Sequence, residues 1–208
     1  LLADGGQLDL ARRQLRGAAE KNPAQRAQFV IGEAALLREA KQLTAAMDVL
    51  DQGLAADPDQ PDLLYESALL AERLGRQTVS ETRLRKLLTL QPENAHAYNA
   101  LGYSYADRNI NLPEARQLIE KALQLAPDDP FILDSLGWVM YRQGDLEGAL
   151  AKLEQAHAKR PDPEIAAHIG EVQFRLGRHA DAQRTFREAL KKDPDNEVLN
   201  EAARKFAP

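Results

Sequence analysis

The sequence predicts an all-α fold, a solenoid of stacked helix–turn–helix repeats, and two observations support that prediction. The first is a proline that recurs at steps of 33 to 35 residues, at Pro23, Pro58, Pro92, Pro127, Pro161 and Pro194. The second is a small residue twelve positions before each proline and a large apolar residue eight positions before it. A period of this length is the signature of a repeat array in which each unit packs on its neighbours.

Each period contains two helical patterns, and the copy at 130–162 shows them most clearly. Leu133 and Met140 belong to an apolar stripe at helical spacing. Gly144 then interrupts the pattern, and glycine suits the residue that follows a helix C-terminus. A second apolar stripe runs on to Pro161, which cannot continue a helix. The unit is therefore predicted to be a pair of helices joined by a tight turn.

The same reasoning places helices along the whole chain. The predicted ranges are 8–21, 24–40, 43–56, 61–74, 77–90, 95–108, 112–125, 130–142, 146–159, 163–176, 179–192 and 196–206. Asn111 and Asn196 are predicted N-caps, because an asparagine side chain can accept a hydrogen bond from a free amide of the first turn. Leu199 and Phe206 on the last helix are expected to cover the end of the array.

The predicted domain organisation is a single array over residues 1–208. Its parts are a partial repeat at 1–26, full repeats at 27–60, 61–94, 95–129, 130–162 and 163–195, and a capping helix at 196–208. The chain does not begin with methionine. We therefore expect it to be a fragment of a longer protein, with any targeting signal outside it.

Composition narrows the classes of function. The formal net charge is only −5, which argues against a nucleic-acid partner. The chain has no cysteine, so no disulfide or thiolate metal site is expected, although this leaves the cellular compartment open. No stretch approaches the roughly 18 consecutive apolar residues of a transmembrane helix. Neither a nucleophile–base motif nor a phosphate loop is present, and we predict no enzyme activity and no cofactor.

Several copies resemble the tetratricopeptide repeat (TPR), whose pattern is W-x2-L-G-x2-Y, then A-x3-F and P. The matching residues of one copy are Tyr98, Leu101, Gly102, Tyr105, Ala115, Ile119, Ala122 and Pro127. The resemblance implies a right-handed superhelical solenoid in which the first helix of each repeat lines the concave face. Gly102 and Gly137 are then expected where two helices approach closely.

Residues of the first helices that lie outside the packing stripe are expected to face that concave groove. The candidate protein-binding residues are Tyr65, His96, Asn99, Tyr103, Phe131, Asp134, Trp138, Tyr141, Arg142, His168, Phe174 and Arg175. Aromatic anchors beside a few polar groups are typical of protein-binding surfaces. The alternative is that these aromatics only pack between successive first helices. A metal site at Glu164, His168 and Glu171 lacks a second histidine and is not predicted.

Three segments show a narrower resemblance. The residues at 99–108, 132–142 and 163–172 resemble the C-terminal repeats of proteobacterial outer-membrane TPR lipoproteins. One member of that family is the lipoprotein partner of a periplasmic carboxyl-terminal processing protease, to which it brings cell-wall hydrolases. The resemblance implies a noncatalytic adaptor in the periplasm, held to the outer membrane by an N-terminal lipid outside this chain. Its partners would be the protease and the protease's substrates.

Two other functions remain open. One is a cytoplasmic TPR co-chaperone or assembly factor. The positions of the carboxylate clamp that grips chaperone tails hold Gly32, Glu66, Ala100, Ser135 and His168 here, and these do not supply the clamp's Lys, Asn and Arg. The other is a structural module that associates with itself.

Overall fold

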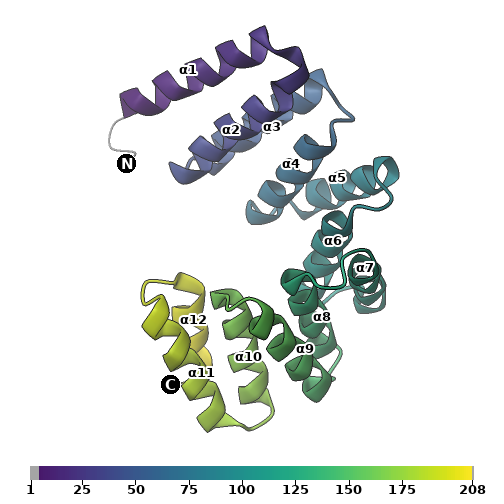
Figure 1. Ribbon diagram of the computed structural model, residues 1–208, viewed down its shortest axis with the longest axis vertical. Coiled ribbons are helices and arrows are strands. Elements are labelled where there is room, and N and C mark those ends of the chain that lie inside the picture. The colour runs from purple at the N-terminus through teal and green to yellow at the C-terminus, as the bar shows by residue number, and fades with distance from the viewer. Residues whose placement is uncertain (1–4, 208) are drawn as a thin grey trace. The chain divides into compact units, whose positions relative to one another are not determined.

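The computed structural model describes residues 5–207, which are helical apart from short turns (Figure 1). The α-helices of this range are α1 (Gly5–Lys21), α2 (Arg26–Glu39), α3 (Leu43–Ala56), α4 (Pro61–Arg73), α5 (Gln77–Leu90), α6 (Ala95–Asp107), α7 (Leu112–Leu125), α8 (Pro130–Arg142), α9 (Leu146–Lys159), α10 (Pro163–Arg175), α11 (His179–Lys192) and α12 (Glu197–Phe206). A short 3-10 turn, η1 (Pro23–Gln25), separates α1 from α2.

The predicted helices are confirmed, with two differences at the N-terminal end. Helix α1 begins at Gly5, three residues before the predicted start at residue 8. Helix α2 begins at Arg26 because Pro23 first forms the 3-10 turn, and Asn22 before it makes no capping hydrogen bond. Neither difference changes the order or the pairing of the helices.

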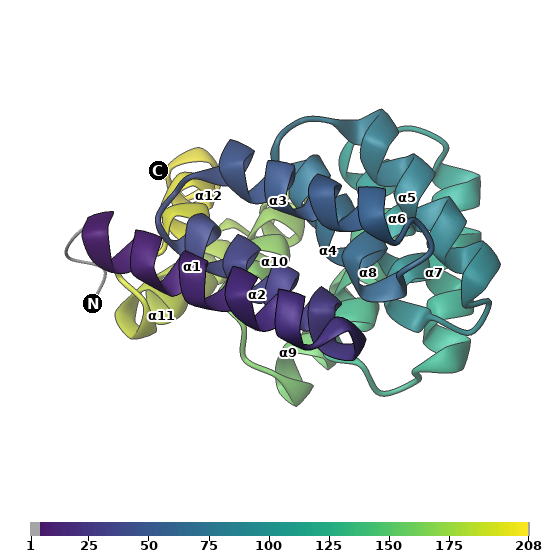
Figure 2. The same ribbon diagram turned by 90° about the horizontal axis from the view of Figure 1, so that it is seen from above.

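The chain forms two compact units, one ending at Glu93 and the other beginning at Asn94. In the first unit α2 packs against α3, and α4 against α5. In the second unit the pairs are α6 with α7, α8 with α9, and α10 with α11, while α12 packs on α10 and α11. Helices α6 and α8 lie side by side in both views of the second unit (Figure 1, Figure 2). The single array over 1–208 stays a prediction.

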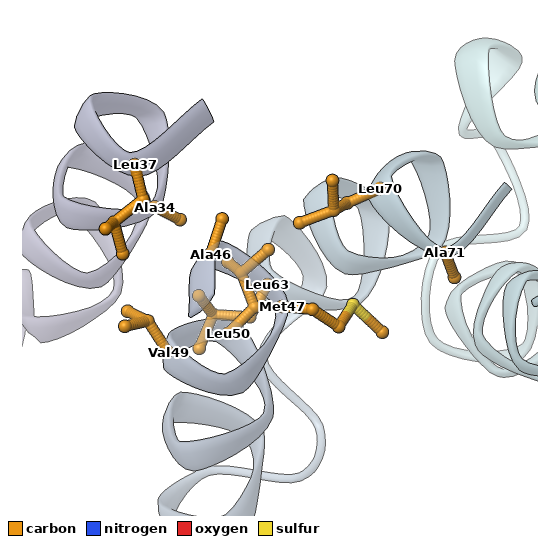
Figure 3. Packing of buried hydrophobic residues seen from close by; sticks show 9 residues of the cluster. All are labelled: Ala34, Leu37, Ala46, Met47, Val49, Leu50, Leu63, Leu70 and Ala71. Atoms are coloured by element: carbon orange, nitrogen blue, oxygen red, sulfur yellow. The ribbon is translucent and has the colours of Figure 1, made fainter. Parts of the chain in front are cut away.

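The core of the first unit follows the periodic residues. Ala34, Leu37, Ala46, Met47, Val49, Leu50, Leu63, Leu70 and Ala71 gather between α2, α3 and α4 (Figure 3). Ala46 lies at the small-residue position of the repeat and Leu50 at the large one, and both are buried. Burying a leucine side chain contributes about 1.5–3 kcal/mol, so the in-phase residues account for much of the stability of the stack.

The first helix of each pair ends in the same way. The residue after its C-cap has a positive φ, and these residues are Lys41, Gly75, Asn109, Gly144 and Gly177. At Gly144 the backbone N–H donates to the Tyr141 carbonyl at 3.0 Å, and the next N–H, of Asp145, donates to the Met140 carbonyl at 3.0 Å. These two hydrogen bonds together form the Schellman motif. The prediction that Gly144 follows a helix C-terminus is confirmed.

The two predicted asparagine caps differ in outcome. Asn196 is confirmed, because its Oδ1 accepts from the Leu199 N–H at 3.1 Å. Asn111 precedes α7 but makes no side-chain cap, so that prediction is wrong. Its φ of 46° is left-handed, whereas capping residues normally adopt the β region. Pro113 also removes the second amide of the helix, one of the two donors that a cap would bind.

Helix α12 closes the second unit as expected. Leu199 and Phe206 are buried against Ala166, Ala182 and Phe186 of the preceding pair. Arg204 and Lys205 of the same helix remain exposed. The apolar end of the last repeat is thereby covered, which a helical array requires.

Candidate protein-binding face

Three first helices of the second unit carry polar and aromatic residues one turn apart. Helix α6 carries Asn99, Tyr103 and Asp107, α8 carries Asp134, Trp138, Tyr141 and Arg142, and α10 carries His168, Glu171 and Arg175. Side chains three or four residues apart share one side of a helix. We call these ten residues the α6–α8–α10 face, and the contacts below join them across the three helices.

A buried pair lies at the centre of this face. His168 Nδ1 and Asp134 Oδ1 are 2.8 Å apart, and the imidazole stacks on the Trp138 ring with a centroid distance of 4.1 Å and an interplanar angle of 22°. The Tyr103 ring lies 6.4 Å from the imidazole on the side of α6. One histidine of α10 therefore connects all three helices.

The charge on His168 is set by its neighbours. Burial alone lowers the pKa of the imidazole, but the charge and hydrogen bond of Asp134, with the charges of Glu164 and Glu171, outweigh it, and the pKa of His168 is raised. The surroundings thus favour the imidazolium, which donates to the carboxylate and places a cation against an aromatic ring.

A second network joins α8 to α10. The Tyr141 hydroxyl donates to Glu171 Oε1 at 2.7 Å and accepts from Arg175 Nε at 3.2 Å. Burial, and next the bond to Glu171, raise the pKa of Tyr141. Burial and the charge of Asp107 raise the pKa of Tyr103 as well. Both hydroxyls therefore stay protonated at neutral pH and remain hydrogen-bond donors.

Arg142 joins α8 to α6. Its guanidinium carbon lies 4.7 Å from the centroid of the Trp138 ring and 5.7 Å from that of Tyr141. Its Nη2 donates to the Asp107 backbone carbonyl at 3.0 Å and lies 3.7 Å from the Asp107 carboxylate. A guanidinium held over an aromatic face adds a cation–π attraction to the charge pair.

Three polar atoms of this face are buried without a hydrogen-bond partner within residues 5–207. They are Asn99 Oδ1, Trp138 Nε1 and Arg142 Nε. Buried polar groups in folded proteins almost always have a partner, so each such atom requires an explanation. One acceptor and two donors are therefore unpaired within the packing of α6 and α8.

Two of the sequence candidates lie deeper than expected. Trp138 and Asp134 were predicted to face an open groove, but they are only 4% and 7% exposed. The physical reason is that His168, one repeat later, covers both of them. At Trp138 the alternative expectation, packing between successive first helices, therefore describes the contact correctly.

The other candidates fall into two groups. Tyr141 and Arg142 are half-buried and Arg175 is exposed, so these three are open to a partner. Phe174 instead packs on His179 and on Phe206 of α12, at centroid distances of 4.7 Å and 5.6 Å. That the face binds a partner stays a prediction.

Like Phe174, three further candidates lie outside the face. Phe131, at the start of α8, is 44% exposed, and the Arg160 guanidinium lies 4.9 Å from its ring centroid. His96 is exposed in the first turn of α6, and Tyr65 lies on α4 in the other unit.

Asp107 and Glu171 belong to the face but were not among the twelve candidates. Helical spacing from Asn99 and His168 does place both residues on the groove side of their helices.

Other kinds of site find little support in the described part of the chain. No group of three or more metal-ligating side chains gathers there. His168, the one histidine of the Glu164–Glu171 stretch, already bonds Asp134. In residues 5–207 no helix has the length and apolar character needed to cross a bilayer.

Antiparallel helix pairs that repeat along the chain define a helical repeat protein. The sequence pattern of the tetratricopeptide repeat matches residues 1–61 and 62–130, and a second pattern of the same repeat matches residues 140–205. The chain belongs to the tetratricopeptide repeat family.

One relative is the TPR repeat-containing protein PA4667 of Pseudomonas aeruginosa. It is 42% identical over 169 residues, which are 81% of this chain and 29% of that protein. The chain thus spans less than a third of the length of the relative that it matches.

Solved structures confirm the predicted all-α solenoid. The TPR protein TTC0263 of Thermus thermophilus aligns with a TM-score of 0.77 at 23% identity, over 86% of this chain and 97% of that one. A TPR protein of Parabacteroides merdae aligns with a TM-score of 0.79 at 19% identity, over 99% and 81%. YrrB, described as a TPR protein with an unusual peptide-binding site, aligns with a TM-score of 0.57 at 19% identity, over 91% and 97%.

Helical repeat arrays offer extended surfaces to other proteins, and TPRs are generally noncatalytic interaction modules. Membership of this family therefore makes the chain a protein–protein interaction scaffold.

Proposed function

We propose that this chain is a noncatalytic adaptor that binds a partner protein or peptide through the α6–α8–α10 face. The observation that carries the proposal is the group formed by Tyr141, Arg142 and Arg175, which are half-buried or exposed on this face. Arg175 Nε donates to the Tyr141 hydroxyl at 3.2 Å, and the Arg142 guanidinium carbon lies 5.7 Å from the centroid of the Tyr141 ring. A partner can therefore reach two arginines and one tyrosine that already lie together.

A polypeptide suits these three side chains. Each residue of a peptide backbone offers a carbonyl acceptor, which can accept from the guanidinium groups of Arg142 and Arg175. Tyrosine and arginine are also, with tryptophan, the residue types most enriched among residues that dominate binding energy.

The narrower role that we propose is an adaptor for a periplasmic carboxyl-terminal processing protease. In this proposal the protein is held at the outer membrane by a lipid on a segment outside this chain. The support is the resemblance of 99–108, 132–142 and 163–172 to the C-terminal repeats of outer-membrane TPR lipoproteins. Those segments contain most residues of the α6–α8–α10 face. That YrrB is described as binding a peptide also favours a peptide ligand for this fold.

The test compares two matched pairs of substitutions. Arg142→Gln with Arg175→Gln removes two charges from the face, and Arg116→Gln with Arg184→Gln removes two from the outer helices α7 and α11. Binding of the purified protease is measured by calorimetry for each variant and for the unaltered chain. We expect the face variant to bind at least about tenfold more weakly and the control to bind normally, because buried arginine contacts dominate many interfaces.

Equal binding by the face variant would place the site elsewhere. If the unaltered chain does not bind the protease but captures another envelope protein, and the face substitutions abolish that capture, the protease role is rejected and the adaptor function is supported. Melting curves of all variants establish that folding is unaffected.

A further inference from the structure

The second unit contains a cleft on the other side of α10. It has a volume of about 290 Å³ and lies between α9 and α11, with α10 as its floor. Ala166, Ile169 and Gln173 of α10 line it, at helical spacing, while His168, Glu171 and Arg175 occupy the opposite side of the same helix. The cleft is therefore separate from the α6–α8–α10 face.

The floor of the cleft is apolar and its rim is acidic. Ala166 and Ile169 form the floor, and the carboxylates of Glu154, Asp162, Glu188 and Asp193 line the cleft beside the single ammonium of Lys192. Four carboxylates against one ammonium leave an excess of negative charge. An apolar floor under an acidic rim fits a ligand with an apolar stem and a cationic head.

Two of these carboxylates are already engaged. Asp162 Oδ1 accepts from the Glu164 N–H at 2.9 Å, and Asp193 Oδ2 accepts from Asn196 Nδ2 at 2.9 Å. Glu154 and Glu188 are exposed, on α9 and α11 respectively, and neither has a hydrogen bond or ion pair within residues 5–207. The walls of the cleft thus each offer one open carboxylate.

His157 also lines the cleft. Burial, and next the charge of Lys192, lower the pKa of His157, so its ring is neutral at neutral pH. The imidazole therefore adds no positive charge to the cleft, and Lys192 remains the one cation among the residues that line it.

We propose that this cleft is a second binding site, which takes an arginine side chain of a partner polypeptide. A guanidinium presents five N–H donors in a planar fork, enough to reach acceptors on two walls at once. Its three-carbon stem covers the apolar floor. A cleft of this volume lies at the small end of ligand sites and suits one long side chain rather than a folded domain.

The first test uses two peptides that differ in charge alone. One is a five-residue peptide with arginine between pairs of alanines and blocked ends, and the other carries the neutral isostere citrulline at the centre. Both are titrated into the isotopically labelled chain and followed by amide NMR. We expect the arginine peptide to shift amides of α9, α10 and α11 around the cleft and to bind about five- to tenfold more tightly than the citrulline peptide.

Equal affinity of the two peptides would overturn the proposal, and so would shifts confined to other helices. A peptide with lysine at the centre tests whether the planar guanidinium is needed. If the lysine peptide binds as tightly as the arginine peptide, arginine is not the specific ligand.

The second test removes the open carboxylates. Glu154→Gln with Glu188→Gln is compared with Glu147→Gln and Glu201→Gln, two exposed residues that do not line the cleft. We expect the cleft variant to weaken the arginine peptide about five- to tenfold and to leave the citrulline peptide unchanged. Equal weakening by the control pair would mean diffuse attraction to a negatively charged chain and would reject the site.

Discussion

The pair of Asp134 and His168 couples the stability of the second unit to pH. The raised pKa of His168 means that the folded chain binds this proton more tightly than the unfolded chain does. The stabilisation is therefore fully present below the ordinary histidine pKa of about 6.5, and it is lost as pH rises through the higher folded-state pKa.

Asp134→Asn should remove this dependence. We expect the free energy of unfolding of the unaltered chain to fall as pH rises above about 6.5, and Asp134→Asn to lose this fall, because the carboxylate that outweighs the effect of burial on the histidine pKa is gone. At the acidic end the substitution should cost about 1–3 kcal/mol. Urea titrations followed by the fluorescence of Trp138, the single tryptophan, measure this.

The matched control is Asp107→Asn, which removes a carboxylate from the same face. The Asp107 side chain is 54% exposed and lies beside Arg142 rather than His168. This variant should keep the pH slope of the unaltered chain. A slope that survives in Asp134→Asn would show that another group titrates.

At the scale of single residues, the sequence predicts which residues belong to the site better than it predicts the contacts between them. Helical spacing places Trp138, Tyr141 and Arg142 near one side of α8, as the structure has them. It does not predict that His168 covers Trp138, because that contact joins residues on different helices and depends on how the helices pack. Helical spacing therefore left both possibilities open for Trp138, a groove position and packing between successive first helices.

At the scale of the helices, Gly102 is a position where α6 packs tightly against α7. A Cβ at this position would lie 2.7 Å from Ile119 Cγ1 and 2.9 Å from the Ala115 carbonyl oxygen. The prediction from sequence that small residues stand where the helices of a pair meet is confirmed here. The backbone oxygen cannot move aside without shifting a helix.

Gly102→Ala should therefore destabilise the fold by about 1–3 kcal/mol. Gly17→Ala is the matched control, because a Cβ at Gly17 in the interior of α1 meets no atom within 4 Å. That change should stabilise the chain by about 0.5–1 kcal/mol, since glycine is a poorer helix former than alanine. Urea unfolding followed by circular dichroism gives both values, and a loss at Gly17 as large as at Gly102 would contradict the steric argument.

At Lys41 a substitution to glycine, rather than from glycine, is expected to stabilise the chain. Its φ of 58° is left-handed, and the corresponding turns at Gly75, Gly144 and Gly177 use glycine. Lys41→Gly should raise the free energy of unfolding by about 0.5–1 kcal/mol, because glycine adopts this conformation without a steric cost. Lys41→Ala, which keeps a Cβ, should bring no gain in the same urea experiment. A gain from alanine would show that the lysine charge, not its backbone, is unfavourable.

Helix ends could be predicted where a residue sets a local constraint. Prolines and glycines fix the limits of α8 and α9, whose bounds agree with the predicted ones. The starts of α1 and α2 and the cap at Asn111 were missed. At the start of α2 and at Asn111 the backbone conformation is settled by the turn as a whole rather than by one side chain.

At the scale of the whole molecule, the repeat pattern does not predict the boundary between the two compact units, which lies between Glu93 and Asn94. Pro92 keeps the spacing of the other prolines, so nothing in the periodic pattern marks a boundary there. Compactness depends on the number of contacts between particular helices, which a repeat pattern does not contain.

A fragment that begins at Asn94 should fold by itself. It contains α6 to α12 with their own core and the covering helix α12, which are what an independent unit needs. We expect helical circular dichroism, a cooperative melt and the same Trp138 emission maximum as in the whole chain. A shorter fragment that begins at Leu112 lacks α6, which packs against α8, and should lose that emission maximum. Unfolding of the longer fragment would contradict the independence of this unit.

The α6–α8–α10 face also constrains how such a chain arises by duplication. Asp134 bonds His168, and Tyr141 bonds Arg175, each one period of 34 residues apart, so equivalent positions of successive copies touch each other. Identical copies would set aspartate against aspartate, and like charges at such a distance repel. On this face, divergence between copies is a condition for stacking, and a designer who averaged the repeats into one consensus would remove the complementarity that joins them.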